Sequence, residues 1–246
     1  MDLNADLGEG FGRWELTDDA ALLRVVTSAN VACGFHAGDP ATLRRVCAAA
    51  AERGVTVGAQ VSYRDLAGFG RREMDVPPAE LACEVAYQIG ALRVFAEAAG
   101  TKVRYVKPHG ALYHRAGRDS AQARAVVEGM SIGSVGVLLC QAGTALERVA
   151  RETGIRVVAE AFADRAYTAD GQLLPRGEPG AVLGPEAAAA QAVGLAAGEA
   201  RAVSGELIRI EADSICVHGD SPDAARTAAA VRSALDNQGI KVEAFN

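Results

Sequence analysis

Short apolar runs alternate with longer alanine-rich stretches along the whole chain. The apolar runs are Met1–Asp6, Ser28–Cys33, Val55–Ala59, Lys102–Val106, Val135–Cys140, Arg156–Phe162 and Ser214–His218. The stretches with helical periodicity are Asp18–Val26, Pro40–Arg53, Pro78–Gly100, Ser120–Met130, Thr144–Thr153, Pro185–Val203 and Pro222–Gln238. Short continuous apolar runs between helices are typical of βα units with a buried parallel sheet. The pattern predicts a barrel of seven or eight strands. A doubly wound open sheet is the alternative, because alternation alone does not show closure.

Residues that start and stop helices agree with this division. Asp39–Pro40 and Ser221–Pro222 each pair an N-cap residue with proline at the first helical position. Thr144 followed by Glu147 has the spacing of a capping box. Glycines that end a helical stretch just before an apolar run are Gly54, Gly100, Gly154 and Gly239. These signals predict where the helices begin and end.

The chain is predicted to form one domain, residues 1–246. This length is usual for a single α/β barrel. Half of the residues are apolar, which is enough for a large core without disulfides or structural metals. The segment Tyr167–Leu183 is polar and rich in Gly and Pro, so we predict a long loop there. Residues Ser204–Asp213 could form a small hairpin.

Composition narrows the class of protein. The formal net charge is −6 and no segment concentrates Lys and Arg, so neither nucleic acid nor an anionic membrane is expected as a partner. Five cysteines without a CxxC pair fit reduced thiols better than disulfides. The acidic N-terminal segment does not resemble a signal peptide, and no uncharged apolar run has membrane-spanning length. We expect a soluble cytoplasmic protein. The sequence leaves open whether it forms a homo-oligomer.

Almost every apolar run ends in a cluster of polar side chains. In a βα barrel the carboxyl ends of the strands share one rim, where such barrels carry their active sites. The candidates for catalysis are Asp6, Glu9, His36, Lys107, His109 and Asp164. The candidates for substrate binding are Asn4, Asn30, Asp39, Arg71, Arg72, Tyr113, Arg165, His218 and Asp220. Histidine, carboxylate and lysine converging on one rim would suit acid–base chemistry on a small anionic molecule.

Several of these residues also have a purely structural interpretation. Asp39 precedes Pro40 and would serve equally well as a helix N-cap, and Asp220 can cap the helix that follows it. A lone histidine is usually a hydrogen-bonded residue of the core. However, His36 and His218 are each followed shortly by glycine and aspartate, in HAGD and HGD, after separate predicted strands. This repeated arrangement favours a functional role for both histidines.

Familiar nucleotide and metal motifs are absent from the sequence. There is no GxxxxGK[ST] phosphate loop, and Gly8–Arg13 fails the dinucleotide pattern at its last position. There is no GxSxG elbow, HExxH motif or paired CxxC. Any ATP that is used is therefore not held by a Walker-type loop on this chain. Whether a transition metal binds tightly is left open.

Seven blocks of the sequence resemble the LamB/YcsF family. The blocks are DLNADLGEGFG, SANVACGFHAGDP, GFGRREM, YQIGAL, KPHGALY, EAFADRAY and CVHGD. The resemblance runs from Met1 to Phe245, and the blocks are long and unusual. It implies a seven-stranded β/α barrel of the glycoside hydrolase/deacetylase type. It also implies ATP-dependent hydrolysis of 5-oxoproline to L-glutamate, performed together with 5-oxoprolinase subunits B and C.

The implied reaction assigns hypothetical roles to the residues of the rim. Phosphoryl transfer to the amide oxygen would need cations, usually Mg²⁺ with Lys or Arg, and a general base would direct water onto the carbonyl carbon. The candidates for anion and phosphate contacts are Lys107 and one of Arg71, Arg72 and Arg165. The candidates for holding Mg²⁺ or orienting water are Asp6 and Glu9. The candidates for the general base are His109 and His36. Asp164, His218 and Asp220 would line the rest of the site.

The chain departs from the family at positions 60 and 61. It reads GAQVSYRD where the family usually reads GAHPSYPD, so Gln60 and Val61 replace His and Pro. Glutamine forms hydrogen bonds but cannot act as a general base or a good metal ligand. Two other functions stay open: the Asp/His-rich rim motivates the first, which Gln60 weakens, and the absence of an ATP motif motivates the second. One is a metal-dependent deacetylase or amidohydrolase, and the other is a non-catalytic subunit that binds the lactam and presents it to partner chains.

Overall fold

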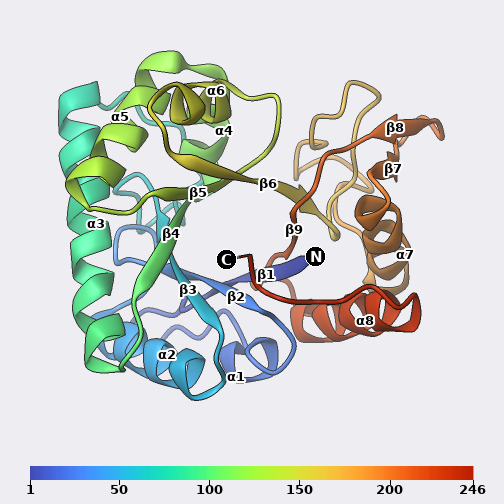
Figure 1. The fold of residues 1–246 in the computed structure, drawn as a ribbon, viewed down its shortest axis with the longest axis horizontal. Coiled ribbons are helices and arrows are strands. Elements are labelled where there is room, and N and C mark those ends of the chain that lie inside the picture. The colour runs from blue at the N-terminus through green and yellow to red at the C-terminus, as the bar shows by residue number, and fades with distance from the viewer. Residues whose placement is uncertain (246) are drawn as a thin grey trace.

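Seven parallel strands close into a barrel in the order β1-β2-β3-β4-β5-β6-β9, and β9 pairs with both β1 and β6 (Figure 1). This computed structural model describes residues 1–245. The strands are β1 (Asp2–Leu7), β2 (Ser28–Ala32), β3 (Thr56–Val61), β4 (Val103–Pro108), β5 (Val137–Cys140), β6 (Arg156–Phe162) and β9 (Ser214–Val217). The predicted seven-stranded α/β barrel is confirmed.

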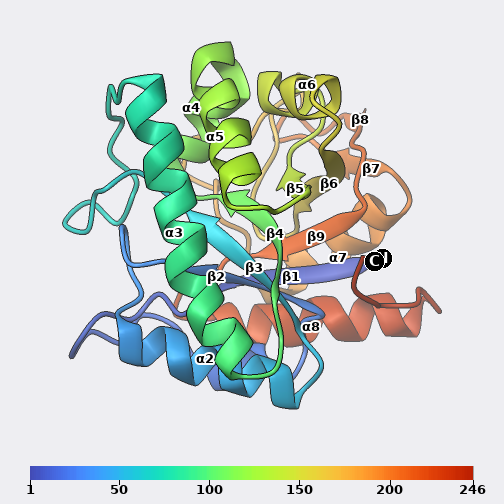
Figure 2. The same cartoon turned by 60° about the vertical axis from the view of Figure 1, so that its left-hand side comes forward.

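Helices surround the barrel on the outside (Figure 1). They are α1 (Asp19–Leu22), α2 (Pro40–Glu52), α3 (Pro78–Ala98), α4 (Gly110–Arg118), α5 (Ser120–Ile132), α6 (Ala145–Glu152), α7 (Pro185–Ala196) and α8 (Ala224–Asn237). The longest of them, α3, runs along the outside of β3 and β4 (Figure 2). A small antiparallel hairpin of β7 (Glu199–Arg201) and β8 (Leu207–Arg209) follows α7. The described helices include none that is long and apolar enough to cross a membrane.

Alternate residues of each barrel strand face the helices and the barrel interior. In β1, Leu3, Ala5 and Leu7 belong to the main hydrophobic core, whereas Asn4 and Asp6 form hydrogen bonds to side chains from other barrel strands. Other buried polar residues of the barrel strands are Asp2, Ser28, Asn30, Gln60, Lys107, Glu160 and Ser214. The interior of the barrel is therefore polar, and its apolar core lies between the strands and the helices.

Hydrogen bonds connect the polar groups inside the barrel, below the rim. Asp2 accepts a hydrogen bond from Ser214, whose Oγ accepts one from Nδ2 of Asn4 at 2.8 Å. Nδ2 of Asn30 donates to Oδ1 of Asn4 at 2.7 Å, and the hydroxyl of Tyr105 donates to Oδ1 of Asn30 at 2.7 Å. Buried polar groups need such partners to offset their loss of water. This network orients the side chains beneath the rim.

The C-terminal segment lies against the amino end of the barrel. The N-terminal amine of Met1 donates to the backbone carbonyl of Lys241 at 2.9 Å, and both chain ends lie close together in Figure 1. The rings of Tyr105 and Phe245 lie 5.1 Å apart in an edge-to-face arrangement. This end of the barrel is therefore covered, and the opposite end is left for the rim loops.

The predicted helix signals are confirmed at most positions. The side chain of Asp39 accepts hydrogen bonds from the backbone N–H groups of Ala41 and Thr42, as an N-cap does. Thr144 accepts one from the backbone N–H of Glu147 in the capping-box pattern. The predicted helix-ending glycines have positive φ and are Gly54, Gly100, Gly154 and Gly239. The segment Tyr167–Leu183 is a loop that contains only isolated bridges, as predicted.

Four predicted boundaries are wrong. The helix expected at Asp18–Val26 ends at Leu22, and the one expected at Pro185–Val203 ends at Ala196, because Gly198 has positive φ and starts the hairpin. The hairpin therefore begins before Ser204. The last helix starts at Ala224, so the Ser221–Pro222 pair precedes it by a turn instead of capping it. Helix α4 lies where the sequence pattern predicts no helix.

Candidate active site

A cavity of about 290 Å³ lies at the carboxyl end of the barrel. The ends of β1, β4, β6 and β9 contribute the side chains Asp6, Lys107, Phe162 and His218. The end of β4 also contributes Pro108, and the loops and α4 contribute Arg71, His109, Gly110, Ala111, Tyr113, His114, Arg165, Leu173, Leu174, Pro175 and Arg176. Charged groups therefore come mainly from the barrel and its adjoining loops. Apolar side chains of Tyr167–Leu183 close the opposite side.

Lys107 lies between two buried carboxylates. Its Nζ is 2.7 Å from Oε1 of Glu160 and 3.2 Å from Oδ1 of Asp6, and all three side chains are at most 4 % exposed. Burial lowers the pKa of Lys107, but the two negative charges outweigh it and hold that pKa well above its usual value. Burial likewise raises the pKa of Asp6, yet Lys107 and the nearby histidines bring it below the usual value. Lys107 is therefore an ammonium ion facing an ionised Asp6.

His218 and Asp164 form a hydrogen-bonded pair beside this cation. Nδ1 of His218 lies 3.0 Å and 3.1 Å from the two carboxylate oxygens of Asp164, and the backbone N–H of His218 donates to the same carboxylate at 2.9 Å. Burial raises the pKa of Asp164, but its contacts with His218 outweigh burial and lower that pKa, so the carboxylate is ionised. Nδ1 therefore carries the proton. In the described part of the chain Nε2 has no hydrogen-bond partner, which leaves its lone pair available in the cavity.

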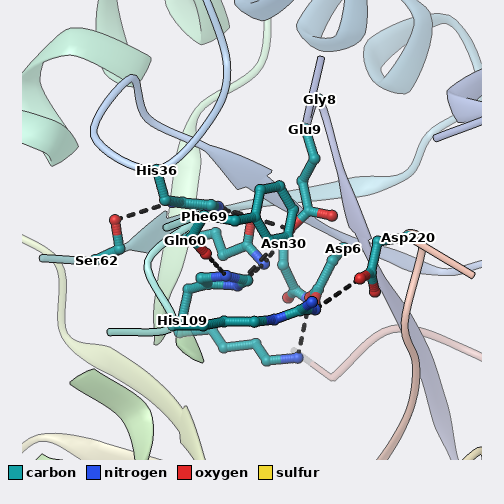
Figure 3. Close-up of polar contacts among 12 residues, drawn as sticks. Asp6, Gly8, Glu9, Asn30, His36, Gln60, Ser62, Phe69, His109 and Asp220 are labelled. Atoms are coloured by element: carbon teal, nitrogen blue, oxygen red, sulfur yellow. Dashed lines mark hydrogen bonds and ion pairs between the residues drawn. The ribbon is translucent and has the colours of Figure 1, made fainter. Parts of the chain in front are cut away.

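A second group of ligand-type side chains lies next to the cavity and is arranged around Gln60 (Figure 3). Nε2 of Gln60 lies 3.2 Å from Oε1 of Glu9 and 3.0 Å from Nδ1 of His109, and Oε1 of Gln60 lies 3.2 Å from Nε2 of His36. The two imidazole rings stack with centroids 3.9 Å apart. Phe69 completes the group through its ring and its backbone carbonyl. The amide thus contacts the other three polar side chains at once.

The hydrogen bonds of this group assign the histidine protons. Nε2 of His109 lies 3.0 Å from the carbonyl oxygen of Phe69, which can only accept, so this nitrogen carries the proton and Nδ1 accepts from Gln60. Nε2 of His36 then donates to Oε1 of Gln60. Nδ1 of His36 lies 2.9 Å from Oγ of Ser62, whose single hydrogen is shared between this nitrogen and the carbonyl of Tyr63. Burial lowers the pKa of His36 to about 4 and that of His109 well below its usual value. Both rings are neutral, and all four ring nitrogens are in use.

Glu9 is the acidic member of the group. Its pKa is raised well above the usual value, first by burial and then by the negative charges of Asp6 and Asp220. One ligand atom each from Glu9, His36 and His109 lies within 4.8 Å of the others, a separation that could hold a metal ion. Gln60 lies between these atoms. The residues therefore have the right chemistry for a transition metal, but an amide stands in the middle of them.

Two arginines from different loops meet at one carboxylate beside the cavity. Nη2 of Arg71 lies 2.7 Å from Oδ2 of Asp220, and Nη1 of Arg176 lies 3.1 Å from the same oxygen. Arg71 belongs to the β3–α3 loop, Arg176 to the β6–α7 loop, and Asp220 follows β9. Burial raises the pKa of Asp220, but the arginines outweigh burial and lower it. The three side chains join loops that surround the cavity, and they present guanidinium groups to it.

The structure brings most of the predicted site residues together. Those that line the cavity are Asp6, Arg71, Lys107, His109, Tyr113, Arg165 and His218. Those that contact this set from a neighbouring position are Glu9 and His36, both against His109, Asp164 against His218, and Asp220 against Arg71. Arg165 lines the cavity but donates to the backbone carbonyls of Ala181 and Leu174, so it holds the loop in place.

Four residues predicted to contact substrate lie outside the cavity. Asp39 lies outside the cavity, because its carboxylate is used in capping α2. Arg72 is turned away and pairs with Asp65. Asn4 and Asn30 are fully buried in the barrel network below Lys107. None of the four lines the cavity in residues 1–245.

Sequence reasoning missed Arg176, which lines the cavity and pairs with Asp220. It lies in a long loop of Gly and Pro residues with no periodicity to indicate where its side chain points. The importance of Gln60 as a hydrogen-bonding centre was also missed. The signal was present, since Gln60 is the polar residue in the buried part of β3.

The fold and the site define a β/α barrel with a charged cavity at the carboxyl ends of its strands, an arrangement used by enzymes. The sequence profile of the LamB/YcsF family matches residues 1–246, and the chain belongs to this family. It is 64 % identical over 248 residues to the 5-oxoprolinase A subunit of Streptomyces avermitilis, covering 100 % of this chain and 99 % of that protein. It is 57 % identical over 247 residues to the 5-oxoprolinase A subunit of Nocardia farcinica, with the same coverage.

Two solved structures are similar to this fold. The lactam utilization protein from Thermus thermophilus superposes with a TM-score of 0.94 at 44 % identity, covering 100 % of this chain and 99 % of that one. A family 4 carbohydrate esterase from Streptomyces lividans gives a TM-score of 0.50 at 12 % identity, covering 100 % and 92 %. The second likeness concerns the fold alone.

Proposed function

We propose that this chain is the part of an ATP-dependent 5-oxoprolinase that opens the cyclic amide of 5-oxoproline to give L-glutamate, together with subunits B and C. Relatives that are named as the A subunit of 5-oxoprolinase match the whole chain at 56–64 % identity, and that name places them in a multi-subunit complex. The observation that carries the proposal is the His218–Asp164 pair, which faces the same cavity as the Lys107 ammonium group.

The cavity suits a small anionic ring. Its volume of about 290 Å³ is near the lower end of the range for small-molecule sites. The substrate carboxylate can replace Asp220 as the partner of Arg71 and Arg176, which already form ion pairs with that residue. The methylene groups of the ring can pack against Phe162 and Leu173 on the apolar side. The residues that line the cavity thus match a small substrate with a carboxylate group and an apolar ring.

His218 is the best placed general base. In a catalytic Asp–His pair the carboxylate orients the imidazole and stabilises its cationic form. Neutral His218 can take a proton from the attacking water at Nε2, and its imidazolium form can return that proton to the ring nitrogen when the C–N bond breaks. The other candidates, His36 and His109, are less suited, because both nitrogens of each ring are already hydrogen-bonded.

Lys107 supplies positive charge where negative charge develops. Water attack on the amide carbon places negative charge on the carbonyl oxygen, or on a phosphate attached to that oxygen. A buried ammonium group stabilises such charge more strongly than an exposed one does. Lys107 lines the cavity and is held by Asp6 and Glu160.

ATP would activate the amide by phosphorylating its oxygen, which makes the ring carbon more electrophilic and releases ADP. Attack by one water and cleavage of the C–N bond would then give an acyl phosphate with a free amine. A second water would hydrolyse that acyl phosphate to L-glutamate and phosphate. The cavity is small for a nucleotide, and the sequence lacks a phosphate-binding loop. We therefore place the nucleotide on the partner subunits, or at their interface with this chain. Mg²⁺ does not fit a site made of these side chains alone, since Oδ1 of Asp6 is already 3.2 Å from the Lys107 ammonium group.

The proposal is tested by reconstituting the chain with subunits B and C and measuring glutamate formed per ATP consumed. We expect Asp164→Asn and His218→Asn each to lower glutamate formation by about 10²–10⁴-fold, as loss of a general base does. Asp236→Asn is the matched control, since that exposed aspartate of α8 pairs only with Arg232 among the described residues. We expect it to leave the rate unchanged.

Two results would contradict the proposal. If the native chain formed no glutamate with both partners present, the reaction would be wrong. If glutamate were formed but the Asp164 and His218 variants kept full activity, the chain would bind the lactam without catalysing its opening. Calorimetry with 5-oxoproline on the isolated chain would then detect that binding.

A further inference from the structure

The group around Gln60 has the composition of a metal site but is filled by an amide. We propose that Glu9, His36 and His109 form a latent transition-metal site whose central position is occupied by the Gln60 side chain, so that the native chain binds no metal there and loss of the amide makes the site available to Zn²⁺ or Co²⁺. This inference is independent of the proposed reaction, because metal binding is measured without substrate.

The distances support a four-coordinate ion. Oε1 of Glu9 lies 3.6 Å from Nε2 of His36 and 3.7 Å from Nδ1 of His109. Ligands about 2.1 Å from a tetrahedral Zn²⁺ lie about 3.4 Å from one another. The His36 and His109 rings are stacked nearly parallel, at 10°, so one of them must also rotate out of the stack before both lone pairs can meet at one ion. Three protein ligands would leave the fourth position for water.

The surroundings of both histidines already have the form that metal ligands require. A ligating imidazole donates its other N–H to a backbone carbonyl or a similar acceptor. His109 donates from Nε2 to the carbonyl of Phe69, which leaves Nδ1 directed at the centre. Nδ1 of His36 contacts Ser62, whose hydroxyl also lies 3.0 Å from the carbonyl of Tyr63. His36 can therefore change to the tautomer in which Nδ1 donates to Ser62 and Nε2 has a lone pair for the metal.

The hydrogen bonds of the Gln60 side chain satisfy all three of the ligand-type residues around it. Its two N–H groups serve Glu9 and the lone pair of His109, and its carbonyl oxygen accepts from His36. One neutral group therefore provides a partner for each of the three ligand-type side chains. A metal would compete with three hydrogen bonds and with the volume of the amide. The buried group therefore keeps its geometry without an ion.

An ion has a route to this position. A second cavity, of about 360 Å³, reaches Glu9 and His36 from the rim, between the loop that carries Trp14 and the loop that carries Phe69. It is lined also by Arg71. Removal of the Gln60 side chain would therefore open a site that solvent and small cations can enter.

The test is a titration of untagged protein with Co²⁺, followed by visible absorption and by metal analysis after gel filtration. We expect Gln60→Ala to retain about one Co²⁺ per chain with the absorption of a four-coordinate ion, and the native chain to retain none. Adding Glu9→Gln to Gln60→Ala should weaken binding by at least the roughly 10–100-fold that loss of an outer partner causes. Gln122→Ala is the matched control, because this buried glutamine contacts Tyr63 and Val76 outside the group.

Each result bears on the inference. Stoichiometric Co²⁺ or Zn²⁺ in the native chain, lost on Glu9→Gln, would overturn it, and this measurement needs no Gln60 variant to fold. Failure of folded Gln60→Ala to bind either ion would overturn it as well. Equal binding by Gln60→Ala and by Gln60→Ala with Glu9→Gln would place the metal elsewhere. Circular dichroism of every variant establishes that it is folded.

Discussion

The buried cation at the base of the cavity allows a quantitative test of the site. We consider Lys107→Met, which keeps the length and much of the apolar stem of the side chain but removes its charge. Lys107 is the ion-pair partner of both Asp6 and Glu160, at 3.2 Å and 2.7 Å, and the three side chains are almost completely buried. Removing one partner of a buried pair costs about 3–5 kcal/mol, because the remaining charge is left uncompensated.

Urea unfolding at pH 7, followed by far-UV circular dichroism, measures this loss as a change in the free energy of unfolding. We expect Lys107→Met to lose about 3–5 kcal/mol, a large part of the stability of an ordinary domain. Lys241→Met is the matched control, since Lys241 is 79 % exposed and pairs with an exposed Glu243. We expect no measurable change for this variant.

A second substitution tests whether the carboxylates left without Lys107 cause the loss of stability. Adding Glu160→Gln to Lys107→Met removes one of the two uncompensated carboxylates, and it should recover at least about 1 kcal/mol. Glu160→Gln alone should be neutral or destabilising, because it leaves Lys107 with Asp6. If Lys107→Met were no more destabilising than Lys241→Met, or if the two buried substitutions were simply additive, the reasoning would be refuted.

Two further predictions concern pH and substrate binding. His36 has a pKa of about 4 in the fold against 6.5 when unfolded, so the unfolded state binds more protons between these values. The free energy of unfolding should therefore fall by about 3 kcal/mol as the pH is lowered from about 7 to about 4. His36→Gln should flatten this dependence on pH. If the dependence were the same in that variant, the conclusion that His36 is buried as a neutral ring would be wrong. Arg176→Ala should raise KM for 5-oxoproline about tenfold with little change in kcat, as expected for uniform binding, and an unchanged KM would remove Arg176 from the carboxylate contacts.

The sequence predicted the barrel well because its signals are local and repeated. Each strand is a short apolar run, and the polar residues inside the barrel lie at alternate positions within those runs. Capping residues such as Asp39 and Thr144 gave helix starts that the structure confirms. Helix α4 has no such signal, since it begins with Gly110 after Pro108 and lacks a side-chain cap. A helix held mainly by tertiary packing leaves little trace in the local pattern.

The site was predicted as a set of residues but not as a set of contacts. Because the carboxyl ends of all barrel strands meet at one rim, side chains at those ends, such as Asp6, Lys107 and His218, are expected to lie close together. It does not tell which histidine has an available nitrogen, because that depends on partners distant in sequence. Asp164 is 54 residues from His218, and Gln60 is 49 residues from His109. Only the three-dimensional arrangement shows that His218, paired with Asp164, has a free ring nitrogen, whereas both ring nitrogens of His36 and of His109 are already hydrogen-bonded.

The loop Tyr167–Leu183 has a consequence for how this fold can change its ligand. It supplies Leu173, Leu174, Pro175 and Arg176 to the cavity without contributing a strand to the barrel. Loops of this kind vary in length and composition without loss of the scaffold. The size and shape of the accepted molecule can therefore be altered by exchanging this one segment, while Asp164 and His218, just beyond the ends of β6 and β9, lie outside it. Chimeras carrying loops of different length, tested for binding of lactams of different size, would measure this effect.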